Sequence, residues 1–322
     1  MKNGILGGTD LEVSRVGLGT VEIGLPYGIG LPDPPPDDEC IGLLRAALDQ
    51  GITYFDTAAG YGRSEELVGK AFSGMGASRP VIATKVKMRA SPSGPELEGA
   101  GRAEHLCASV RQSLASLRAD SLDLVQVYVE EDTFLREEIR SPLLETVESL
   151  TASGQVRFWG ATSYGPADAG GVIRQGKPFR TIQVAYNLLD RTLEHTVLPD
   201  CRKRGLGVVL RSVFLQGVLS HRTESYPANM EPLKQAARKA AAVAGAHGIG
   251  LSECALRFAA HGPAQADVTL FGTFSRTELE QNMAAVAAGP LHEDLMKELA
   301  PLAMDGSELL YPQTWGLPHA FK

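Results

Sequence analysis

The sequence has few of the features that form metal or dithiol sites. Its four cysteines lie far apart and form no Cys-x-x-Cys pair, which argues against a zinc ribbon or a dithiol redox centre. The seven histidines form no His-Glu-x-x-His or similar cluster, so a structural or catalytic metal is not expected. Cysteines spaced in this way are typical of reduced thiols in a cytosolic enzyme.

Long apolar runs and an excess of basic residues are also missing. No window approaches the ~18 consecutive apolar residues of a transmembrane helix, and residues 1–4 lack the apolar run of a signal peptide. The formal net charge is -7, and lysines and arginines are scattered along the chain. The sequence therefore predicts a cytoplasmic protein that binds neither membranes nor nucleic acid, and it leaves the oligomeric state open.

The chain does contain a repeated alternation of strand and helix patterns. Of its 322 residues, 43% are hydrophobic, which suits one large domain over residues 1–322. About eight alternations predict an α/β fold with a parallel sheet and right-handed crossovers, although the pattern alone does not show that the sheet closes. The predicted strands cover residues 15–19, 52–55, 81–84, 122–129, 156–162, 181–185, 207–212 and 268–271.

Capping and loop signals set several expected boundaries. Ser141 followed by Pro142 is the favoured order of an N-cap and a first-turn proline, and residues 277–280 form a capping box. Helices are therefore expected to begin at both places. Residues 24–36 and 89–101 are rich in proline or glycine, and we expect two long loops there of the kind that line barrel active sites.

Three polar side chains, Asp56, Tyr61 and Lys85, come at or just after the ends of two predicted strands. A free phenol has a pKa of about 10, and a neighbouring ammonium lowers it. Lys85 would supply that charge to Tyr61, and Asp56 would hold Lys85 in place. Taken singly, Asp56 could instead cap a turn, Tyr61 could be a half-buried loop aromatic, and Lys85 could be a solvated strand end.

Together these motifs resemble those of the aldo-keto reductases. The similar segments span nearly the whole chain and cover residues 13–20, 55–65, 84–85, 160–163 and 272–282. The resemblance implies a (β/α)8 TIM barrel with nicotinamide as the hydride carrier. It also implies an N-terminal hairpin over residues 5–13 beneath the barrel and a C-terminal substrate loop over residues 304–322. In that family the matching residues make Tyr61 the general acid, Lys85 its tuner and Asp56 the anchor.

The chain departs from the family pattern at three positions near the expected site. Tyr164 stands where the family often has an asparagine after Ser163, which leaves Ser163 and Gln183 to contact the carboxamide of the nicotinamide. Tyr128 stands where the family has a catalytic histidine, so it would position the substrate oxygen through its phenol, or merely fill the space. Arg211 stands where the family stacks an aromatic ring on the nicotinamide. An inward Arg211 would stack on that ring and favour the reduced cofactor, whereas an outward one would form a salt bridge.

The resemblance also assigns cofactor contacts. Residues 212–217 would wrap the pyrophosphate, and residues 272–282 would hold the adenosine end. Ser275, Arg276 and Thr277 at a helix start suit a 2′-phosphate, so NADP(H) is favoured, while Glu278 at the usual basic position keeps NAD(H) possible. The expected cofactor contacts are Gly19, Thr20, Ser163, Gln183, Arg211, Ser212, Phe214, Leu215, Gln216, Gly217, Gly272, Phe274, Ser275, Arg276, Glu278, Gln281 and Asn282.

Tyr27, Tyr164 and Trp315 are candidate walls of the substrate pocket, although ordinary packing would equally explain Tyr27 and Trp315. The acidic residues 130–132 form either a solvated face or a partner for a cationic group. The expected function is NAD(P)H-dependent hydride transfer between nicotinamide and the carbonyl or alcohol carbon of a small molecule. A redox-neutral epimerase or dehydratase that uses the nicotinamide transiently, and a regulatory protein that only binds the cofactor, are the alternatives.

Overall fold

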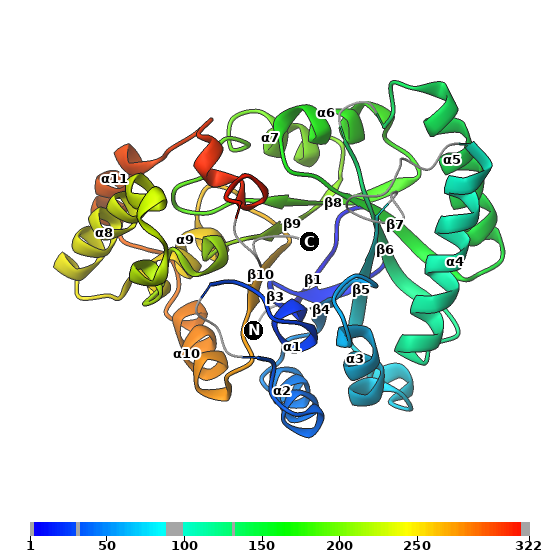
Figure 1. The fold of residues 1–322 in the computed structure, drawn as a ribbon, viewed down its shortest axis with the longest axis horizontal. Coiled ribbons are helices and arrows are strands. Elements are labelled where there is room, and N and C mark those ends of the chain that lie inside the picture. Colours follow the sequence, from blue (N-terminus) through cyan, green and yellow to red (C-terminus); the bar gives the residue numbers. More distant parts are fainter. Residues whose placement is uncertain (1–2, 30–32, 88–98, 131–132, 317–322) are drawn as a thin grey trace.

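Eight parallel strands close into a barrel in the computed structural model, which describes residues 3–29, 33–87, 99–130 and 133–316 (Figure 1). The strands follow one another in chain order, and the last one closes the barrel by pairing with the first. The expected (β/α)8 barrel is thus confirmed. The strands are β3 (Val16–Gly19), β4 (Tyr54–Asp56), β5 (Val81–Val86), β6 (Leu122–Tyr128), β7 (Val156–Thr162), β8 (Phe179–Ala185), β9 (Gly207–Arg211) and β10 (Val268–Gly272).

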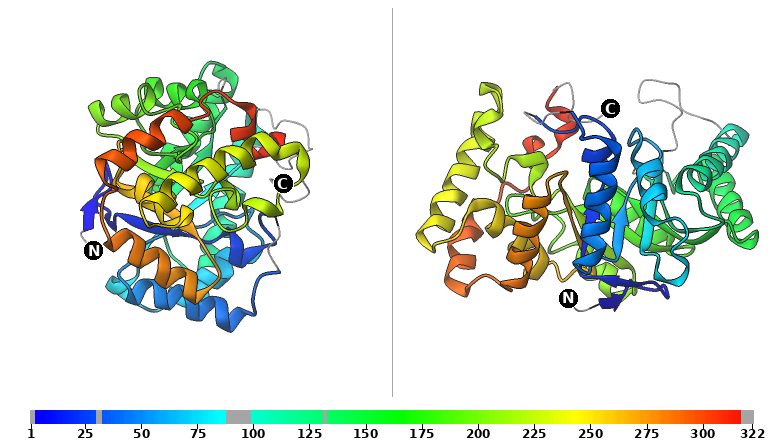
Figure 2. Two further views of the ribbon diagram at one scale, coloured as in Figure 1. Left: turned by 90° about the vertical axis from the view of Figure 1, so that its left-hand side faces the viewer. Right: turned by 90° about the horizontal axis from the view of Figure 1, so that it is seen from below.

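Helices surround the barrel and bury their apolar faces against it (Figures 1 and 2). Two of them, α8 and α9, occupy the single crossover between β9 and β10. Within the described ranges, no helix is both long and apolar enough to cross a membrane. The helices are α1 (Val21–Gly24), α2 (Asp37–Asp49), α3 (Ser64–Phe72), α4 (Gly99–Leu117), α5 (Glu137–Ala152), α6 (Pro166–Gln175), α7 (Val197–Lys203), α8 (Glu231–Ala246), α9 (Leu251–His261), α10 (Arg276–Ala287) and α11 (Glu293–Leu299).

An antiparallel hairpin of β1 (Asn3–Ile5) and β2 (Glu12–Ser14) closes the end of the barrel where the strands begin (Figure 2). Leu6 and Leu11 are buried beside inward-facing barrel residues in a second apolar cluster. At Gly7 a Cβ atom would lie 2.1 Å from the backbone nitrogen of Gly207, so only glycine fits this approach. The hairpin predicted from the resemblance is confirmed, and it leaves the opposite end of the barrel open for a site.

Two predicted helix starts were wrong. Helix α5 begins at Glu137 rather than at Ser141, because two glutamates in its first turn suit the helix dipole. The amide that Pro142 lacks would have bonded to the carbonyl of exposed Glu138, which solvent can satisfy. Helix α10 begins at Arg276, and its N-cap is Ser275, two residues before the predicted cap Thr277, because the Ser275 hydroxyl accepts a hydrogen bond from the amide of Glu278.

The two predicted loops are described only in part. Residues 30–32 and 88–98 lie outside the described residues, while Leu25–Ile29 and Asp33–Pro36 have no regular structure, as expected. The short helix α1, which ends at Gly24, was not predicted, since four residues are too few to show a helical period. Helix α4 begins at Gly99, within the second predicted loop.

Candidate active site

A pocket lies at the carboxyl ends of the barrel strands, which is the end that carries the active site in (β/α)8 enzymes. Residues at or near the ends of six strands and the loops that follow them form its wall. They are Gly19, Thr20, Val21, Glu22, Tyr27, Asp56, Tyr61, Tyr128, Tyr164, Gln183, Arg211, Ser212, Val213, Phe214, Gln216, Gly217, Arg222, Leu270, Phe271 and Gly272.

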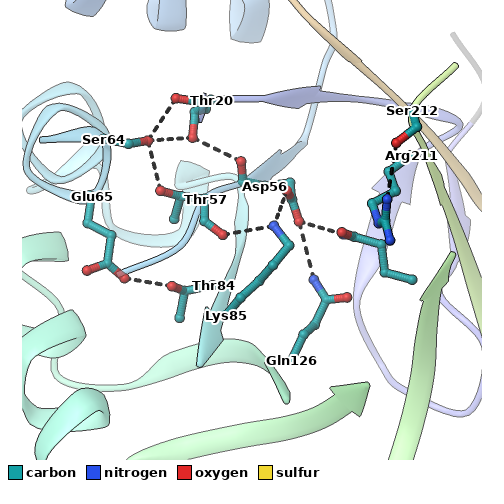
Figure 3. A network of polar contacts seen from close by, with 11 residues as sticks. Thr20, Asp56, Thr57, Ser64, Glu65, Thr84, Lys85, Gln126, Arg211 and Ser212 are labelled. Atoms are coloured by element: carbon teal, nitrogen blue, oxygen red, sulfur yellow. Dashed lines mark hydrogen bonds and ion pairs between the residues drawn. The ribbon is translucent and has the colours of Figure 1, made fainter. Parts of the chain in front are cut away.

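Asp56, a residue of the pocket wall, forms a buried ion pair with Lys85 (Figure 3). Asp56 is the last residue of β4 and is 4% exposed. Lys85 is the last residue but one of β5 and is 2% exposed. Lys85 also donates to the carbonyl of Thr57 at 3.1 Å. The side-chain amides of Gln183 and Gln126 donate to the second oxygen of Asp56 at 2.7 and 3.3 Å. Both charges are therefore paired and hydrogen-bonded, as buried charges must be.

Tyr61 is positioned by a close approach of two backbone segments. A Cβ on Gly24, at the end of α1, would lie 1.9 Å from the carbonyl oxygen of Tyr61. Gly62 has a φ of +56°, and a Cβ there would lie 2.3 Å from the carbonyl oxygen of Gly24. The amide of Arg63 donates to the same Gly24 oxygen at 3.2 Å. These two glycines therefore fix the turn that carries Tyr61 into the pocket.

The electrostatics of Tyr61 differ from the sequence expectation. Burial raises its pKa well above the usual value, the Asp56 carboxylate raises it further, and the main cation that lowers it is Arg211. Lys85 lies over the ring of Tyr61, with its Nζ 4.8 Å from the ring centroid, and its charge is balanced by Asp56. Tyr61 is therefore a protonated phenol near neutral pH, and the net shift of its pKa is upward rather than the downward one expected from Lys85.

Arg211 points into the pocket at the end of β9. Its guanidinium carbon lies 4.2 Å from the centroid of the Tyr164 ring, in a stacked cation–π contact. Its two terminal nitrogens donate to the carbonyl of Ser163 at 3.0 Å and to the hydroxyl of Ser212 at 3.1 Å. No carboxylate of the described chain lies within salt-bridge distance of it, so the outward salt bridge considered from the sequence does not form.

Four phenols share this end of the pocket with Arg211. They belong to Tyr27, Tyr61, Tyr128 and Tyr164, and burial is the largest cause that raises the pKa of each. All four side chains are therefore neutral hydrogen-bonding groups near neutral pH. Tyr128 ends β6 and lies within the pocket wall.

The loop after β9 has an unusual backbone at the other end of the pocket. Ser212, Leu215, Gln216 and Gly217 have φ values of +61°, +46°, +57° and +103°, respectively. Such left-handed conformations cost roughly 1–3 kcal/mol each in non-glycine residues, and they cluster at ligand sites. Arg222 packs directly against this loop, since a Cβ on Gly217 would lie 2.8 Å from its Nε. The turned backbone and the guanidinium together suit a bound anion.

Comparisons with known proteins agree with this geometry. A sequence profile described as the Aldo/keto reductase family matches residues 15–303. The chain belongs to the aldo/keto reductase family. Members of this family are typically NAD(P)H-dependent oxidoreductases that act on small-molecule carbonyl compounds.

Two curated aldo/keto reductase relatives and one solved structure illustrate the similarity. The chain is 35% identical over 222 residues to "Aldo-keto reductase YhdN" of Bacillus subtilis, covering 68% of this chain and 64% of that protein, less than two thirds of its length. It is 30% identical over 316 residues to "L-galactose dehydrogenase" of Arabidopsis thaliana, covering 94% and 91%. The structure of aldo-keto reductase AKR11C1 from Bacillus halodurans (holo form) superimposes with a TM-score of 0.75, 25% identity and coverage of 94% and 96%.

The aldo/keto reductase pocket presents polar atoms that suit a nicotinamide dinucleotide. The hydroxyl of Ser163 and the side-chain carbonyl of Gln183 are buried without a partner in the described chain, so one donor and one acceptor are available for a carboxamide. Arg222 likewise has buried Nε and Nη1 groups without an acceptor, beside the loop suited to phosphate. By contrast, the described residues include no group of three or more histidine, cysteine, aspartate or glutamate side chains able to hold a metal.

The segment expected to bind the adenosine end lies beyond the pocket wall. Arg276 is exposed and its nearest charge is Glu280 at 3.7 Å, while Glu278 accepts a hydrogen bond from Thr273 at 2.6 Å. The carboxylate of Glu278 is therefore held at the start of α10, and Arg276 is turned toward another acid. The remaining expected contacts outside the pocket wall are Ser163, Leu215, Phe274, Ser275, Gln281 and Asn282.

Trp315 packs away from the pocket wall in this aldo/keto reductase. Its ring meets that of Tyr226 edge-on with centroids 5.6 Å apart, and its indole N–H donates to the carbonyl of Leu309 at 2.9 Å. The structure thus shows the ordinary packing of a tail segment for this residue. Residues 131–132 of the acidic run and residues 317–322 of the predicted substrate loop lie outside the described residues.

Sequence reasoning missed several residues that the structure brings to the site. Arg222 and Glu22 line the pocket, and Gln126 supports Asp56 from the barrel interior. Burial raises the pKa of Glu22 to about 7, against a lowering effect of Arg222. Gln126 could have been predicted as a site residue because it is a polar residue inside the barrel on β6, whereas no local sequence pattern distinguishes Arg222 or Glu22. The remaining unpredicted wall residues are Val21, Val213, Leu270 and Phe271.

Proposed function

We propose that this protein is an oxidoreductase in which Tyr61 gives a proton to, or takes one from, the oxygen of a small carbonyl or alcohol substrate. The observation that carries the proposal is the pocket that brings Tyr61 together with Asp56 of the buried Lys85–Asp56 pair and with the unpartnered side-chain oxygen of Gln183. The unpartnered hydroxyl of Ser163 belongs to a residue whose carbonyl accepts a hydrogen bond from Arg211 of the same wall. A nicotinamide dinucleotide, when bound, supplies or accepts the hydride. Ser163 and Gln183 would hold its carboxamide, and the 212–217 loop with Arg222 would hold its pyrophosphate.

The residues around Tyr61 would each have a separate task. Lys85 places a positive charge against the face of the phenol ring, which stabilises negative charge as the proton leaves. Asp56 holds Lys85, and the amides of Gln126 and Gln183 hold Asp56. Tyr128 would donate a second hydrogen bond to the substrate oxygen, as a neutral group in a developing oxyanion site.

Titration of the purified protein with NADH and NADPH, followed by product analysis, would test the proposal. We expect fluorescence changes that saturate with at least one dinucleotide, and oxidation of that dinucleotide when a small aldehyde is added. A substrate isomer formed without net change of the dinucleotide would instead indicate the redox-neutral alternative. Binding without any turnover would indicate the regulatory alternative, and no binding of either dinucleotide would contradict the proposal.

The arrangement at the adenosine end bears on dinucleotide preference. The sequence favoured NADP(H), but the negative charge of Glu278 at the start of α10 opposes a 2′-phosphate, whereas a carboxylate can accept hydrogen bonds from a ribose hydroxyl. Arg276 is turned toward Glu280 rather than toward that position. We therefore propose that NAD(H) binds at least as tightly as NADP(H).

Replacing Glu278 with arginine would test this preference. We expect Glu278→Arg to shift the ratio of NADPH to NADH affinity by about tenfold or more toward NADPH, because a charge repulsion becomes a charge-assisted contact. Fluorescence titration with both dinucleotides measures the ratio. Arg276→Gln, in the same first turn of α10, is the matched control and should leave the ratio unchanged. An unaltered ratio in Glu278→Arg would show that the 2′ position lies elsewhere.

A further inference from the structure

Arg211 is a cation that forms no ion pair with any carboxylate of the described residues. Its side chain uses two of its five N–H groups in the contacts to Ser163 and Ser212, and no other acceptor in the described chain lies within hydrogen-bond distance. Its Nη groups are held in a fixed direction by those contacts and by the Tyr164 ring. A guanidinium held in this way presents its remaining donors to the pocket that it lines.

The acids nearest to this end of the pocket are already engaged. Asp56 is paired with Lys85, so together they add no net charge. Asp190 is buried and is influenced by Arg211, but its carboxylate accepts hydrogen bonds from the amide and hydroxyl of Thr192 at 3.3 and 2.9 Å. It lies beyond salt-bridge distance of Arg211. The phenols around Arg211 are neutral, and Glu22, the other acid of the pocket wall, is influenced by Arg222. Among the described residues, therefore, no anion at this end of the pocket offsets the charge of Arg211.

The pocket wall contains a second arginine, Arg222, so each of the two expected anions can have a cation of its own. Arg222 packs against Gly217 in the loop suited to a pyrophosphate, whereas Arg211 lies among the phenols that surround Tyr61. A dinucleotide phosphate therefore has its own cation, and Arg211 faces the part of the pocket where the substrate is converted. A single guanidinium fork matches a group of one negative charge and two coplanar oxygens, which is a carboxylate.

We propose that the substrate is a carbonyl or hydroxy compound that also carries a carboxylate, and that Arg211 binds this carboxylate while Tyr61 meets the reacting oxygen. This inference rests on the proposed oxidoreductase function, and it names the substrate class of the same site. The carboxylate itself is unchanged in the reaction. The proposal of an anionic substrate also replaces the suggestion, made from the sequence, that the acidic residues 130–132 pair with a cationic group.

Binding of a matched pair of probes tests the proposal without turnover. Calorimetric titration with benzoate and with its neutral analogue benzamide, in the presence of saturating dinucleotide, should show benzoate bound at least about tenfold more tightly. Arg211→Gln should abolish that difference, and Arg211→Lys should retain part of it. Arg222→Gln is the matched control, because it should weaken dinucleotide binding and leave the preference for benzoate intact.

A second pair of probes measures the same preference in turnover. The kcat/KM ratio of 4-formylbenzoate to its methyl ester should exceed about ten in the wild type and fall toward one in Arg211→Gln. Thermal unfolding of each variant shows whether it is folded, and Arg211→Met offers a second neutral replacement. Equal binding of benzoate and benzamide by the wild type, or a preference that survives in both neutral variants, would overturn the proposal. A benzoate preference that depends on Arg211 without dinucleotide binding or turnover would leave the carboxylate site standing and refute the oxidoreductase function.

Discussion

Tyr61→Phe is expected to lower kcat for carbonyl reduction by about 10²–10⁴-fold, because it removes the phenol hydroxyl that donates the proton and leaves the ring in place. The phenylalanine ring keeps the contact with the Lys85 ammonium, so the buried Lys85–Asp56 pair should be undisturbed. Dinucleotide affinity should therefore be unchanged. Steady-state rates together with fluorescence titration of the dinucleotide measure the two quantities separately.

Tyr128→Phe is the matched control, since it removes a phenol of the same pocket that is expected to position the substrate rather than to transfer the proton. We expect it to raise KM or lower kcat far less than Tyr61→Phe does. A large loss of kcat in Tyr128→Phe, with Tyr61→Phe nearly active, would transfer the proton-donor role to Tyr128. Equal and small effects of both would remove acid catalysis from the mechanism.

The raised pKa of Tyr61 gives this prediction a pH dependence. Reduction requires the protonated phenol, and burial and Asp56 raise its pKa, so the protonated form persists through neutral pH and beyond. The rate of reduction should therefore show no alkaline fall due to Tyr61 below about pH 10. Oxidation of an alcohol requires the deprotonated phenol, so its rate should rise with pH over the same range. A reduction rate that falls between neutrality and pH 9 in the wild type, and not in Tyr61→Phe, would contradict this assignment.

The residues of the pocket differ in how far the sequence could place them. Asp56, Tyr61 and Lys85 end or follow neighbouring strands, and parallel strands bring their carboxyl ends to one edge, so their proximity could be predicted. The direction of Arg211 could not be predicted, because it depends on the Tyr164 ring and the Ser163 carbonyl, which come from another strand-to-helix loop. Spacing also placed Lys85 near Tyr61, but it did not show that the ammonium lies over the ring with its charge balanced.

The elements of the fold also differ in whether local sequence signals were enough to predict them. Strand β7 was predicted over its full length, because a buried parallel strand is marked by its own apolar residues. The start of α5 was not, because Pro142 is a local signal that the preceding glutamates override. Arg222 was missed since nothing in its own neighbourhood distinguishes it from a surface arginine. Its role depends on the close packing against Gly217, which only the folded chain provides.

Lys85→Met is expected to reduce the free energy of unfolding by about 3–5 kcal/mol, because it leaves the buried carboxylate of Asp56 without its counter-charge. The amides of Gln126 and Gln183 still donate to Asp56, but they carry no net charge. Urea unfolding of Lys85→Met and of the wild type at neutral pH measures the difference.

The double variant Lys85→Met/Asp56→Asn separates this electrostatic cause from a loss of packing. Asparagine retains an oxygen that can accept from Gln183, and no charge remains buried, so most of the lost stability should return. Turnover should not return with it, because the ammonium over the Tyr61 ring is still missing. A double variant as unstable as Lys85→Met would assign the deficit to the lost lysine chain rather than to the unpaired charge. Since stability and turnover respond to different members of the pair, a variant that is stable and inactive would show that the barrel retains this buried pair for its chemistry and not for its fold.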